Sequence, residues 1–460
     1  MPGFPRTGFA KRGPVLGPRS TLALALAFAF AAAACKGEPD DTPWCSAAAA
    51  STPAEAPVSK VPTWYADVKP IAAAKCQRCH VEGGIGPFPL VERASWASEA
   101  SSIRRAVETR HMPPWHAARC CTDYHEDASL TDAELRTLLR WIDSGTPEGD
   151  PKDDRPAPPP VGGLSRVDLT LSLPAPYLPR PPAGKIDENR CFIVDWPLST
   201  PKYITGFNPV PGNREVVHHL IVGEIEDDAL DKGLEAQGKS DRPGFDCNEI
   251  MQYALRDVKV IGGSLIGTDY PGGLGHRMEP GKKILINVHY SLVNGPARVP
   301  DTTKIQLKLD DNAREFKGIA VANLAWLVGG GMTVRAGDPD ARVFYRFKPS
   351  LYTGIRKTVS LWSAVPHMHA FGSRFVMRVV RDDDSRQCLL EIPKWYFGWE
   401  AQYWFQRPIV LEPDDEIYVE CHFDNSAKNQ KNGQAPRDIG WGEENQEMCA
   451  GFLAFVEGAP

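Results

Sequence analysis

Two histidines one residue apart, His367 and His369, stand in the apolar run "AVPHMHAFG". In a β-strand, side chains at positions i and i+2 point to the same face. The two imidazoles would then face one point, where they could supply two nitrogen ligands to a metal ion. Taken alone, the pattern favours two surface or hydrogen-bonded histidines, so other motifs must support a metal site.

Further candidate ligands occur in similar strand-like contexts. "VVHHLIV" contains His218 and His219, "INVHYS" contains His289, and "ENQEMCAGFLAF" contains Met448. Adjacent residues of an ideal strand point to opposite faces. His218 and His219 could therefore bind one ion only through a bend, a bulge or different ring nitrogens.

The motif Cys76-Gln-Arg-Cys79-His80 has the C-x-x-C-H pattern at which haem c is attached. In that chemistry two thiols add to the porphyrin vinyl groups and the histidine binds the iron. A C-x-x-C pair without the histidine would indicate a redox or zinc site, and a chance disulfide is the minor alternative. The motif predicts haem c as a cofactor.

The sixth haem ligand is expected within residues 61–150. Met112 is the one methionine of that stretch, and a thioether ligand is common in cytochromes c. Two prolines follow it and stiffen the loop. His111 and His116 are near in sequence, so a haem with two histidine ligands is the alternative.

The spacing of apolar residues predicts that the chain has a helical part followed by a β-rich part. In "LTDAELRTLLRWIDSGTPEGD", Thr131 is expected to cap a helix, and Gly145 lies just past its end. Residues 61–150 are predicted to form a small all-α cytochrome c domain. A proline-rich linker follows at 151–164. Short runs of β-branched and aromatic residues then predict two all-β jelly-roll or β-sandwich domains, at 165–302 and 303–460.

The N-terminus predicts export. Residues 1–20 carry four basic residues and no acid, and an apolar stretch ending in small residues follows. This pattern is typical of a signal peptide over residues 1–34. The apolar stretch is too short for us to prefer a membrane-spanning helix. Cys35 follows a run of alanines, as in a lipobox, so we expect a periplasmic protein or an outer-membrane lipoprotein; simple cleavage is the alternative. Residues 35–60 are predicted to be a flexible tether.

Composition narrows the function classes. The 460 residues suggest about three domains. Lysine plus arginine is 52 and aspartate plus glutamate is 58, which gives a net charge of −6, and no basic run indicates a nucleic-acid partner. Eleven cysteines fit an oxidising compartment, where disulfides persist. The adjacent Cys120 and Cys121 have no assigned role.

The ordered motifs resemble the copper type II ascorbate-dependent monooxygenase family, which includes peptidylglycine α-hydroxylating monooxygenase and dopamine β-monooxygenase. That family has an HH pair, a histidine in a "VHY" context, an HxH pair and a methionine in an "EMC" context. All four occur here in the same order, over roughly residues 185–460. The N-terminal haem motif is absent from the animal enzymes and resembles fusions in bacterial members.

The resemblance implies two copper ions. An electron-storing copper would be held by three imidazoles: His218, His219 and His289. The oxygen-activating copper would be held by two imidazoles and a thioether: His367, His369 and Met448. Neutral imidazole suits copper, and a thioether favours Cu(I).

The resemblance also implies a disulfide between Cys421 and Cys449, which would hold the strand that carries Met448. A blue-copper site is the alternative, because Cys449 stands beside Met448, and the implied disulfide counts against it. Some residues outside the motifs are left without a partner or a ligand role: Cys191, Cys247, Cys388, His276 and His422.

The substrate site departs from the family pattern. The peptide-amidating enzyme holds a substrate carboxylate through an arginine, an asparagine and a tyrosine, and the corresponding residues here are Val365, Ala450 and Phe452. The bidentate clamp of arginine on carboxylate is therefore missing. Phe452 and Phe371 would line a more apolar pocket, which favours a small or apolar substrate.

These patterns predict a copper-dependent monooxygenase that uses O₂ to hydroxylate a C–H bond. Electrons would come through the fused haem, from ascorbate or from another donor such as a redox partner protein. The alternatives are a non-catalytic electron-transfer or copper-binding envelope protein, and a scaffold whose ligands only hold the β-domains together.

Overall fold

The structure is a computed structural model that describes residues 60–460 except 83–85, 157–161, 184, 251–252, 254–257, 264–266, 293–294, 353–354, 398, 431–433 and 443–445. The predicted signal peptide, Cys35 and the tether up to residue 59 lie outside the described residues. The described residues belong to one compact unit. Among the described residues, none of the helices is long and apolar enough to cross a membrane.

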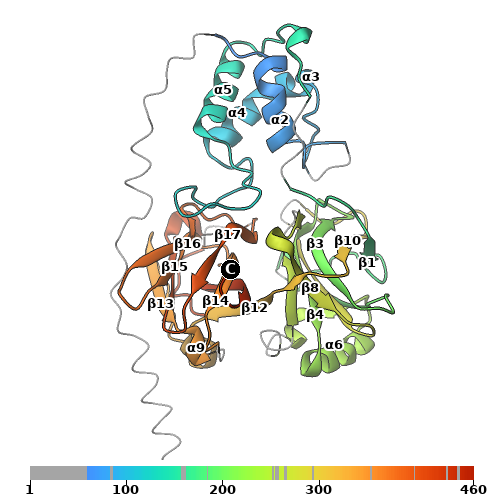
Figure 1. The fold of residues 1–460 in the computed structure, drawn as a ribbon, viewed down its shortest axis with the longest axis vertical. Helices are drawn as coiled ribbons and strands as arrows, with labels where there is room; N and C mark the ends of the chain where they lie inside the picture. Colours follow the sequence, from blue (N-terminus) through green and yellow to red (C-terminus); the bar gives the residue numbers. More distant parts are fainter. Residues whose placement is uncertain are drawn as a thin grey trace, which may run out of the picture. The chain divides into compact units, whose positions relative to one another are not determined.

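Helices dominate the first part of the described chain (Figure 1). They are α2 (Lys69–Lys75), α3 (Arg93–Ser98), α4 (Ala100–Glu108) and α5 (Asp132–Asp143). The expected cap is present, because the Thr131 hydroxyl accepts a hydrogen bond from the Glu134 amide and the Glu134 carboxylate accepts one from the Thr131 amide. Trp64, Trp96 and Trp141 form the buried centre of this segment.

Two sheets with a shared core form the first β-sandwich. One sheet has the order β1-β10-β3-β8-β11, with β7 on β3, and the other has the order β5-β2-β9-β4-β6. The strands are β1 (Leu169–Ser172), β2 (Asp187–Asp195), β3 (Lys202–Val210), β4 (Val217–Ile225), β5 (Phe245–Asp246), β6 (Val258–Gly263), β7 (Thr268–Asp269), β8 (Leu274–Met278), β9 (Lys283–Ser291), β10 (Lys304–Asp310) and β11 (Arg314–Glu315). The inward-facing side chains of both sheets make one apolar core.

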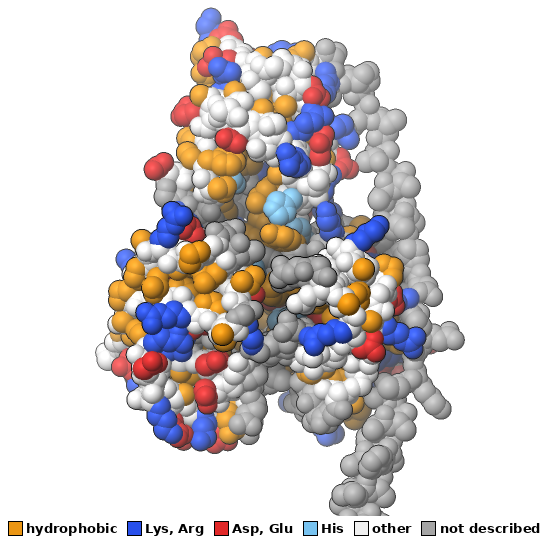
Figure 2. All heavy atoms as spheres, turned by 180° about the vertical axis from the view of Figure 1, so that it is seen from behind, with side chains coloured by type: hydrophobic (Ala, Val, Ile, Leu, Met, Phe, Trp, Pro, Cys, Tyr) orange, Lys and Arg blue, Asp and Glu red, His pale blue; other side chains and the backbone are white. Residues whose placement is uncertain are grey.

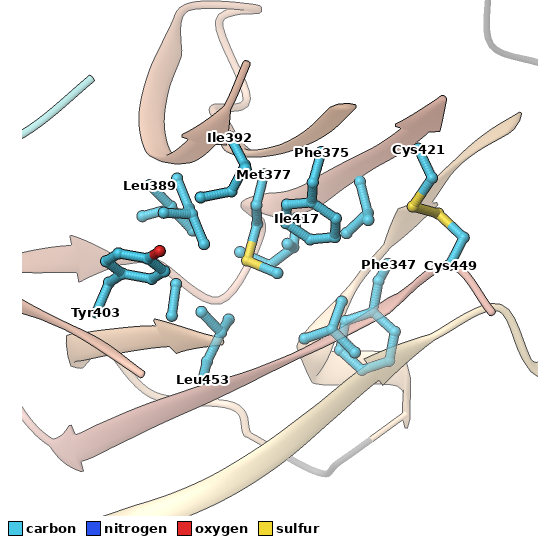
Figure 3. Close-up of a cluster of buried hydrophobic side chains, with 14 of the residues drawn as sticks. Phe347, Phe375, Met377, Leu389, Ile392, Tyr403, Ile417, Cys421, Cys449 and Leu453 are labelled. Carbon is cyan, nitrogen blue, oxygen red and sulfur yellow. A yellow bond between two sulfur atoms is a disulfide. The ribbon is translucent and has the colours of Figure 1, made fainter. Parts of the chain in front are cut away.

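Two four-stranded sheets form the second sandwich, in the orders β12-β19-β14-β17 and β13-β18-β15-β16. The strands are β12 (Lys317–Ala322), β13 (Ala341–Phe347), β14 (Val359–His367), β15 (Gly372–Val380), β16 (Arg386–Ile392), β17 (Tyr403–Leu411), β18 (Glu416–Phe423) and β19 (Ala450–Glu457). Figure 3 shows Phe375, Met377 and Leu453 packed in its core, with the Cys421–Cys449 disulfide at one side.

The two sandwiches share apolar contacts. Trp404 of β17 packs on Tyr270 and Phe316, with ring centroids 5.0 and 5.6 Å apart, and the core of the first sandwich includes Trp404 and Trp362. Aromatic side chains bury large areas, so this contact helps to fix the sandwiches against each other.

The predicted fold class, an all-α cytochrome c domain followed by two all-β domains, is wrong. The chain is mostly β-structure, and its β-rich part also contains helices α6 (Asp227–Lys239), α8 (Leu324–Gly329) and α9 (Pro349–Tyr352). The segment between α4 and α5 is not helical. It is joined to the second sandwich by the Cys121–Cys388 disulfide and by a β-bridge between Tyr124 and Phe405. The helices are therefore one part of a larger compact unit and not an all-α domain.

Charged side chains of both signs are interspersed on the face drawn in Figure 2. Several form surface ion pairs, such as Lys69 with Asp154 at 2.6 Å and Arg277 with Glu279 at 2.8 Å. Pairs of this exposed kind contribute about 0–1 kcal/mol each, so they do not determine the fold.

Candidate metal centre

Three histidines of the first sandwich come together on one sheet. His219 of β4 stands opposite His289 of β9, and the register of the two strands shifts between Val217 and His219. The bulge at this shift turns His218 to the side of its neighbour. The Nδ1 atoms of His218 and His219 are 3.1 Å apart.

The geometry of this first cluster fits a metal ion. One donor atom from each of His218, His219 and His289 lies within 4.8 Å of the others. Two nitrogens bound to one ion at about 2 Å lie at most about 4 Å apart, so small side-chain movements would complete the set. Asp187 Oδ1 lies 3.5 Å from His289 Nε2.

Burial favours the neutral, ligating form of these histidines. Burial, with a further contribution from His289, lowers the pKa of His218 to about 4 and that of His219 to about 3. Metal binding requires the neutral imidazole, so no proton has to be displaced from these two rings at neutral pH.

A second pair of histidines lies in the second sandwich. His367 ends β14 and His369 follows in the next turn, with ring centroids 5.3 Å apart. His367 Nδ1 is 3.2 Å from the Glu400 carboxylate, and His369 Nδ1 donates to the carbonyl of Gln446 at 3.0 Å. A hydrogen bond on one ring nitrogen, here Nδ1 of each histidine, is the usual arrangement at metal-bound histidines.

Met448 belongs to the chain segment beside His369. Glu447 is fully buried and accepts hydrogen bonds from the amides of His369 and Phe371, at 2.8 and 2.7 Å. Burial raises the pKa of Glu447 to about 7. The half-buried Met448 follows Glu447 and precedes Cys449, whose disulfide to Cys421 of β18 is the bridge that the resemblance implied. These contacts hold Met448 near the second histidine pair.

One loop between β16 and β17 touches both histidine groups. We call residues 395–400, without the undescribed residue 398, the shared loop. Trp395 Nε1 donates to the His369 carbonyl at 3.0 Å. The Phe397 ring centroid lies 5.3 Å from that of His218, 6.0 Å from that of His289 and 6.2 Å from that of His369.

Glu400, in the same loop, is the charged group beside the second pair. Its side chain is only 10% exposed. Burial raises the pKa of Glu400, but the neighbouring His367, His219 and His369 outweigh burial and lower it to about 2.

An apolar surface lies beside His367, formed by the residues that stand where the carboxylate-binding side chains were expected: Val365, Ala450 and Phe452. Val365 of β14 pairs with Phe452 of β19, and His367 pairs with Ala450. Cross-strand partners and i, i+2 neighbours share a face, so these four side chains lie on one side of the sheet. Val365 and Phe452 are partly exposed there.

The haem motif lies at the end of α2. Cys76 and Cys79 are free thiols, and burial raises the pKa of both, that of Cys76 to about 12. His80 Nδ1 donates to the Phe88 carbonyl at 2.9 Å, which leaves Nε2 for an iron ligand. Gly86 is close to this ring, because a Cβ there would lie 2.6 Å from His80 Nδ1.

The predicted axial ligands lie in the segment after α4. Met112 is half-buried, and its role at the haem stays a prediction. The rings of His111 and His116 lie against Tyr396 of the shared loop, with centroids 4.9 and 6.1 Å from that ring. Burial first, then His111 and Lys394, lowers the pKa of His116 to about 4.

Among the described residues, the histidines and cysteines outside the ligand motifs also have structural partners. Buried His276 binds the Glu224 carboxylate at 2.9 Å, and His422 contacts Glu420 and Asp340. Cys191 pairs with Cys247, and Cys121 pairs with Cys388. Cys120 is also disulfide-bonded.

Sequence reasoning missed the shared loop. Phe397 and Glu400 occur in "KWYFGWEAQYW", which has no metal-ligand spacing. The one available signal was a lone acid in an aromatic-rich run, a setting in which a buried carboxylate needs a partner.

The fold and the clusters describe a β-sandwich protein with one three-histidine cluster that could hold a metal ion and a second pair of histidines. Residues 350–459, which include His367, His369 and Met448, match the family model "Copper type II ascorbate-dependent monooxygenase, C-terminal domain". The match over this segment supports a relation to the copper type II ascorbate-dependent monooxygenase family. In general terms, the match supports a copper-dependent monooxygenase, which is an oxidoreductase.

Other comparisons add little. A search of curated proteins gives no match. A solved protein from Parabacteroides distasonis is 8% identical, with 64% of this chain and 89% of that chain covered and a TM-score of 0.16. The VP2 subviral particle of infectious bursal disease virus is 10% identical, with 60% and 72% covered and a TM-score of 0.16. Similarities this weak carry no argument about fold or function.

Proposed function

We propose that this protein is a two-copper monooxygenase that hydroxylates a C–H bond of a small or apolar substrate. The observation that carries the proposal is the convergence of His218, His219 and His289 in a chain whose C-terminal segment matches the copper monooxygenase family. Two separate clusters of copper-type ligands are more than a structural metal needs, because a structural site is normally a single closed one.

The ligand sets divide as the resemblance implies. His218, His219 and His289 would hold one copper, and His367, His369 and Met448 would hold the other. The coppers would supply single electrons and activate O₂, so that one oxygen atom enters the substrate. Three imidazoles suit both copper oxidation states, whereas the thioether of Met448 favours Cu(I) at the second site.

The chain's own residues orient these ligands. Glu400 and the Gln446 carbonyl fix the ring planes of His367 and His369 through their Nδ1 atoms. Phe397 covers His218, His289 and His369 with an apolar ring, which reduces the access of water to both clusters. Exclusion of water protects reactive species from side reactions.

The surface beside His367 supports the proposed substrate class. Val365, Ala450 and Phe452 offer no hydrogen bond or charge there, so a carboxylate would lose its hydration without compensation. An apolar molecule would lose nothing by binding. Phe371, which follows His369 by two residues and is partly buried, would add to this wall.

The haem supply of electrons is a further part of the proposal. The free thiols of Cys76 and Cys79 and the oriented His80 fit a covalently bound haem, with Met112 as its other axial ligand. Such a haem would supply single electrons. Contacts of His111 and His116 with Tyr396 support this role, because Tyr396 precedes Phe397 in the loop that touches both clusters.

The proposed setting is an exported one. Disulfides such as Cys121–Cys388, Cys191–Cys247 and Cys421–Cys449 are typical of oxidising compartments, which supports the periplasm. Lipidation of Cys35 would add attachment to the outer membrane, and ascorbate or a redox partner protein would deliver electrons.

The test is to express the exported chain with haem maturation and copper, then to measure bound copper and oxygen uptake with a reductant. Two coppers per haem, with oxygen uptake lost in Met448→Ala, support a working monooxygenase. Two coppers without oxygen uptake under any reductant would favour the electron-transfer or copper-binding alternative. Haem without copper would contradict both ligand sets.

A further inference from the structure

The first cluster depends on an irregular stretch of backbone. His218 and His219 are adjacent, and the shift in register between β4 and β9 at this point brings both rings to one side. A shift of one residue along a strand turns a side chain to the opposite face. Whatever fixes the backbone just before this bulge therefore also decides whether the two rings meet His289.

The fully buried carboxylate of Asp301 holds the turn that leads into β4. Its Oδ1 atom accepts hydrogen bonds from the amides of Gly212 and Asn213, at 3.1 and 2.9 Å, and from the Thr303 hydroxyl at 2.9 Å. Gly212 allows the close approach, because a Cβ there would lie 2.4 Å from the Thr302 amide nitrogen. A buried carboxylate is costly unless hydrogen bonds or positive charge compensate it, so these donors are fixed to Asp301.

The turn passes its position on to the start of the strand. The Asn213 carbonyl accepts hydrogen bonds from the amides of Val216 and Val217, at 3.4 and 3.1 Å. Val217 is the first residue of β4 and directly precedes His218. A continuous chain of hydrogen bonds therefore runs from the Asp301 carboxylate to the residue before the bulge.

The other oxygen of the same carboxylate holds the second ligand strand. Asp301 Oδ2 accepts a hydrogen bond from the buried Tyr290 hydroxyl at 2.9 Å. Tyr290 follows His289 on β9 and is the strand partner of Val217. Adjacent residues of a strand point to opposite faces, so Tyr290 reaches Asp301 in the core while His289 faces the cluster.

We propose that Asp301 is a positioning residue for the first copper site. Its carboxylate joins the turn before β4 to Tyr290 of β9 and so sets the bulge at which His218 and His219 meet His289. The inference rests on the proposed function, because it requires copper at this cluster. Groups that orient metal ligands typically account for a factor of about 10–100 in metal affinity.

Three substitutions test the two arms of this carboxylate. Asp301→Ala removes the contacts of both oxygens. Asp301→Asn keeps the shape, since its oxygen can accept from the turn amides while its NH₂ group donates to the Tyr290 oxygen. It should therefore rescue the site. Tyr290→Phe removes the hydrogen bond to Oδ2 alone and keeps the ring in the core.

Glu224 provides the matched control. It is a buried carboxylate on β4, five residues beyond His219, and it lies 2.9 Å from His276 Nε2 and 2.8 Å from Lys282 Nζ. Glu224→Ala thus removes a compensated buried charge from the same strand, away from the turn. It should lower stability without changing the first cluster.

The measurement is a Cu(II) titration against a competing chelator, with the Cu(II) EPR spectrum, on the full haem-containing chain. A His369→Ala background isolates the first cluster, and a His289→Ala background isolates the second. We expect Asp301→Ala to lower Cu(II) affinity at the first cluster about tenfold and to change its EPR spectrum, with a smaller loss in Tyr290→Phe. The second cluster should keep its affinity. Circular dichroism checks that each variant is folded.

The outcomes are distinct. Loss at the first cluster alone in Asp301→Ala, with rescue by Asp301→Asn, supports the proposal. An equal loss in Glu224→Ala, or an equal loss at both clusters, shows general destabilisation and overturns it.

If Asp301→Ala does not fold, Tyr290→Phe decides: loss confined to the first cluster supports the proposal, and unchanged affinity overturns it. A folded Asp301→Ala variant with unchanged affinity and spectrum overturns the inference and leaves the proposed function intact. Absence of copper at the first cluster of the unsubstituted chain overturns the proposed function itself.

Discussion

Ring orientation at the histidine clusters depends on the nitrogen that faces away from the proposed metal. The Nδ1 atoms of His367 and His369 are held by Glu400 and by the Gln446 carbonyl. In the first cluster, the Nδ1 atoms of His218 and His219 instead face each other. The two clusters therefore present different ring nitrogens, which gives the two proposed coppers different environments.

Replacement of His289 by alanine should remove one copper and leave the other. His289 is 5% exposed and completes the set with His218 and His219, so two imidazoles would remain at the first cluster. We expect the copper content to fall from two to one per chain, as measured by elemental analysis. His125→Ala, which changes a histidine outside both clusters, should keep two. Two retained coppers in His289→Ala would contradict the first ligand set.

A substitution at Gly86 would test the haem motif, because this glycine packs closely against the His80 ring. A Cβ at this position would lie 2.6 Å from His80 Nδ1, so Gly86→Ala should displace the ring. We expect a loss of about 1–3 kcal/mol in the free energy of unfolding, with less covalently bound haem by haemochrome absorbance. In Gly238→Ala the added methyl group has open space in helix α6, so both quantities should be kept. Unchanged haem content in Gly86→Ala would count against His80 as the iron ligand.

At the scale of elements, Met448 depends on how β18 and β19 are joined. The Cys421–Cys449 disulfide closes a loop across 28 residues, next to Met448. Replacement of both cysteines by alanine should lower the free energy of unfolding by about 2–4 kcal/mol. It should also weaken copper binding at the second cluster, because Met448 loses its neighbouring anchor.

The control for this disulfide is the Cys191–Cys247 pair in the first sandwich. Removal of this disulfide should lower the free energy of unfolding by a similar amount. It should leave the copper affinity of the second cluster unchanged. Chemical denaturation and a copper titration on both double variants make the comparison. Equal effects on copper affinity would mean that Met448 is held by the sheet alone.

His422 of β18 makes a pH-dependent ionic contact with Glu420 of the same strand and with Asp340, which directly precedes β13. Burial lowers the pKa of His422, but hydrogen bonds to Glu420 and Asp340 outweigh burial and raise it. Because the folded pKa is raised, the contribution of His422 is fully present below its unfolded pKa of about 6.5 and is lost as pH rises through the folded value. Glu420, whose pKa is lowered to about 2, stays ionised throughout.

The free energy of unfolding, measured by denaturation, should therefore decrease as the pH rises from slightly acidic to alkaline values. The decrease should be smaller in the His422→Gln variant. The difference between the two proteins isolates this histidine from the other titrating groups. Parallel pH profiles would show that the His422 contact contributes no pH dependence.

At the scale of the whole molecule, local patterns were good guides to local structure. The HH motif lies on β4 as expected, and Thr131 forms the capping box of α5. Of the H-x-H pair only His367 lies on a strand, because β14 ends there and His369 follows it. The bulge at His218 was one of three ways that strand geometry allowed, but the sequence did not select among them.

Long-range contacts could not be predicted in the same way. The segment after α4 looked like part of an all-α domain, because apolar periodicity does not report partners more than 200 residues away. Its Cys121 bonds to Cys388, and Tyr124 donates to the Leu389 carbonyl at 3.1 Å. Glu400 and Phe397 were missed for the same reason, since their partners lie on other strands.

These long-range contacts give the last prediction. The Cys121–Cys388 disulfide fixes the segment of His111 and His116 on β16, close in sequence to the shared loop. If electrons pass from the haem segment towards the clusters by way of Tyr396, loss of this bridge should slow them. Electron-transfer rates fall as the distance between donor and acceptor grows. We therefore expect slower haem reoxidation in a Cys121→Ser/Cys388→Ser variant.

The measurement is rapid mixing of the reduced, copper-loaded protein with oxygen, followed at the haem absorbance. The Cys191–Cys247 double variant is the control, because it removes a disulfide far from the His111 segment in sequence and should keep the rate. Haem and copper contents must match in all three proteins, so that the rate reports the connection and not the cofactors. An unchanged rate would mean that the haem segment reaches the clusters without this bridge, whereas haem that stays reduced in every protein would remove the haem from the proposed electron supply.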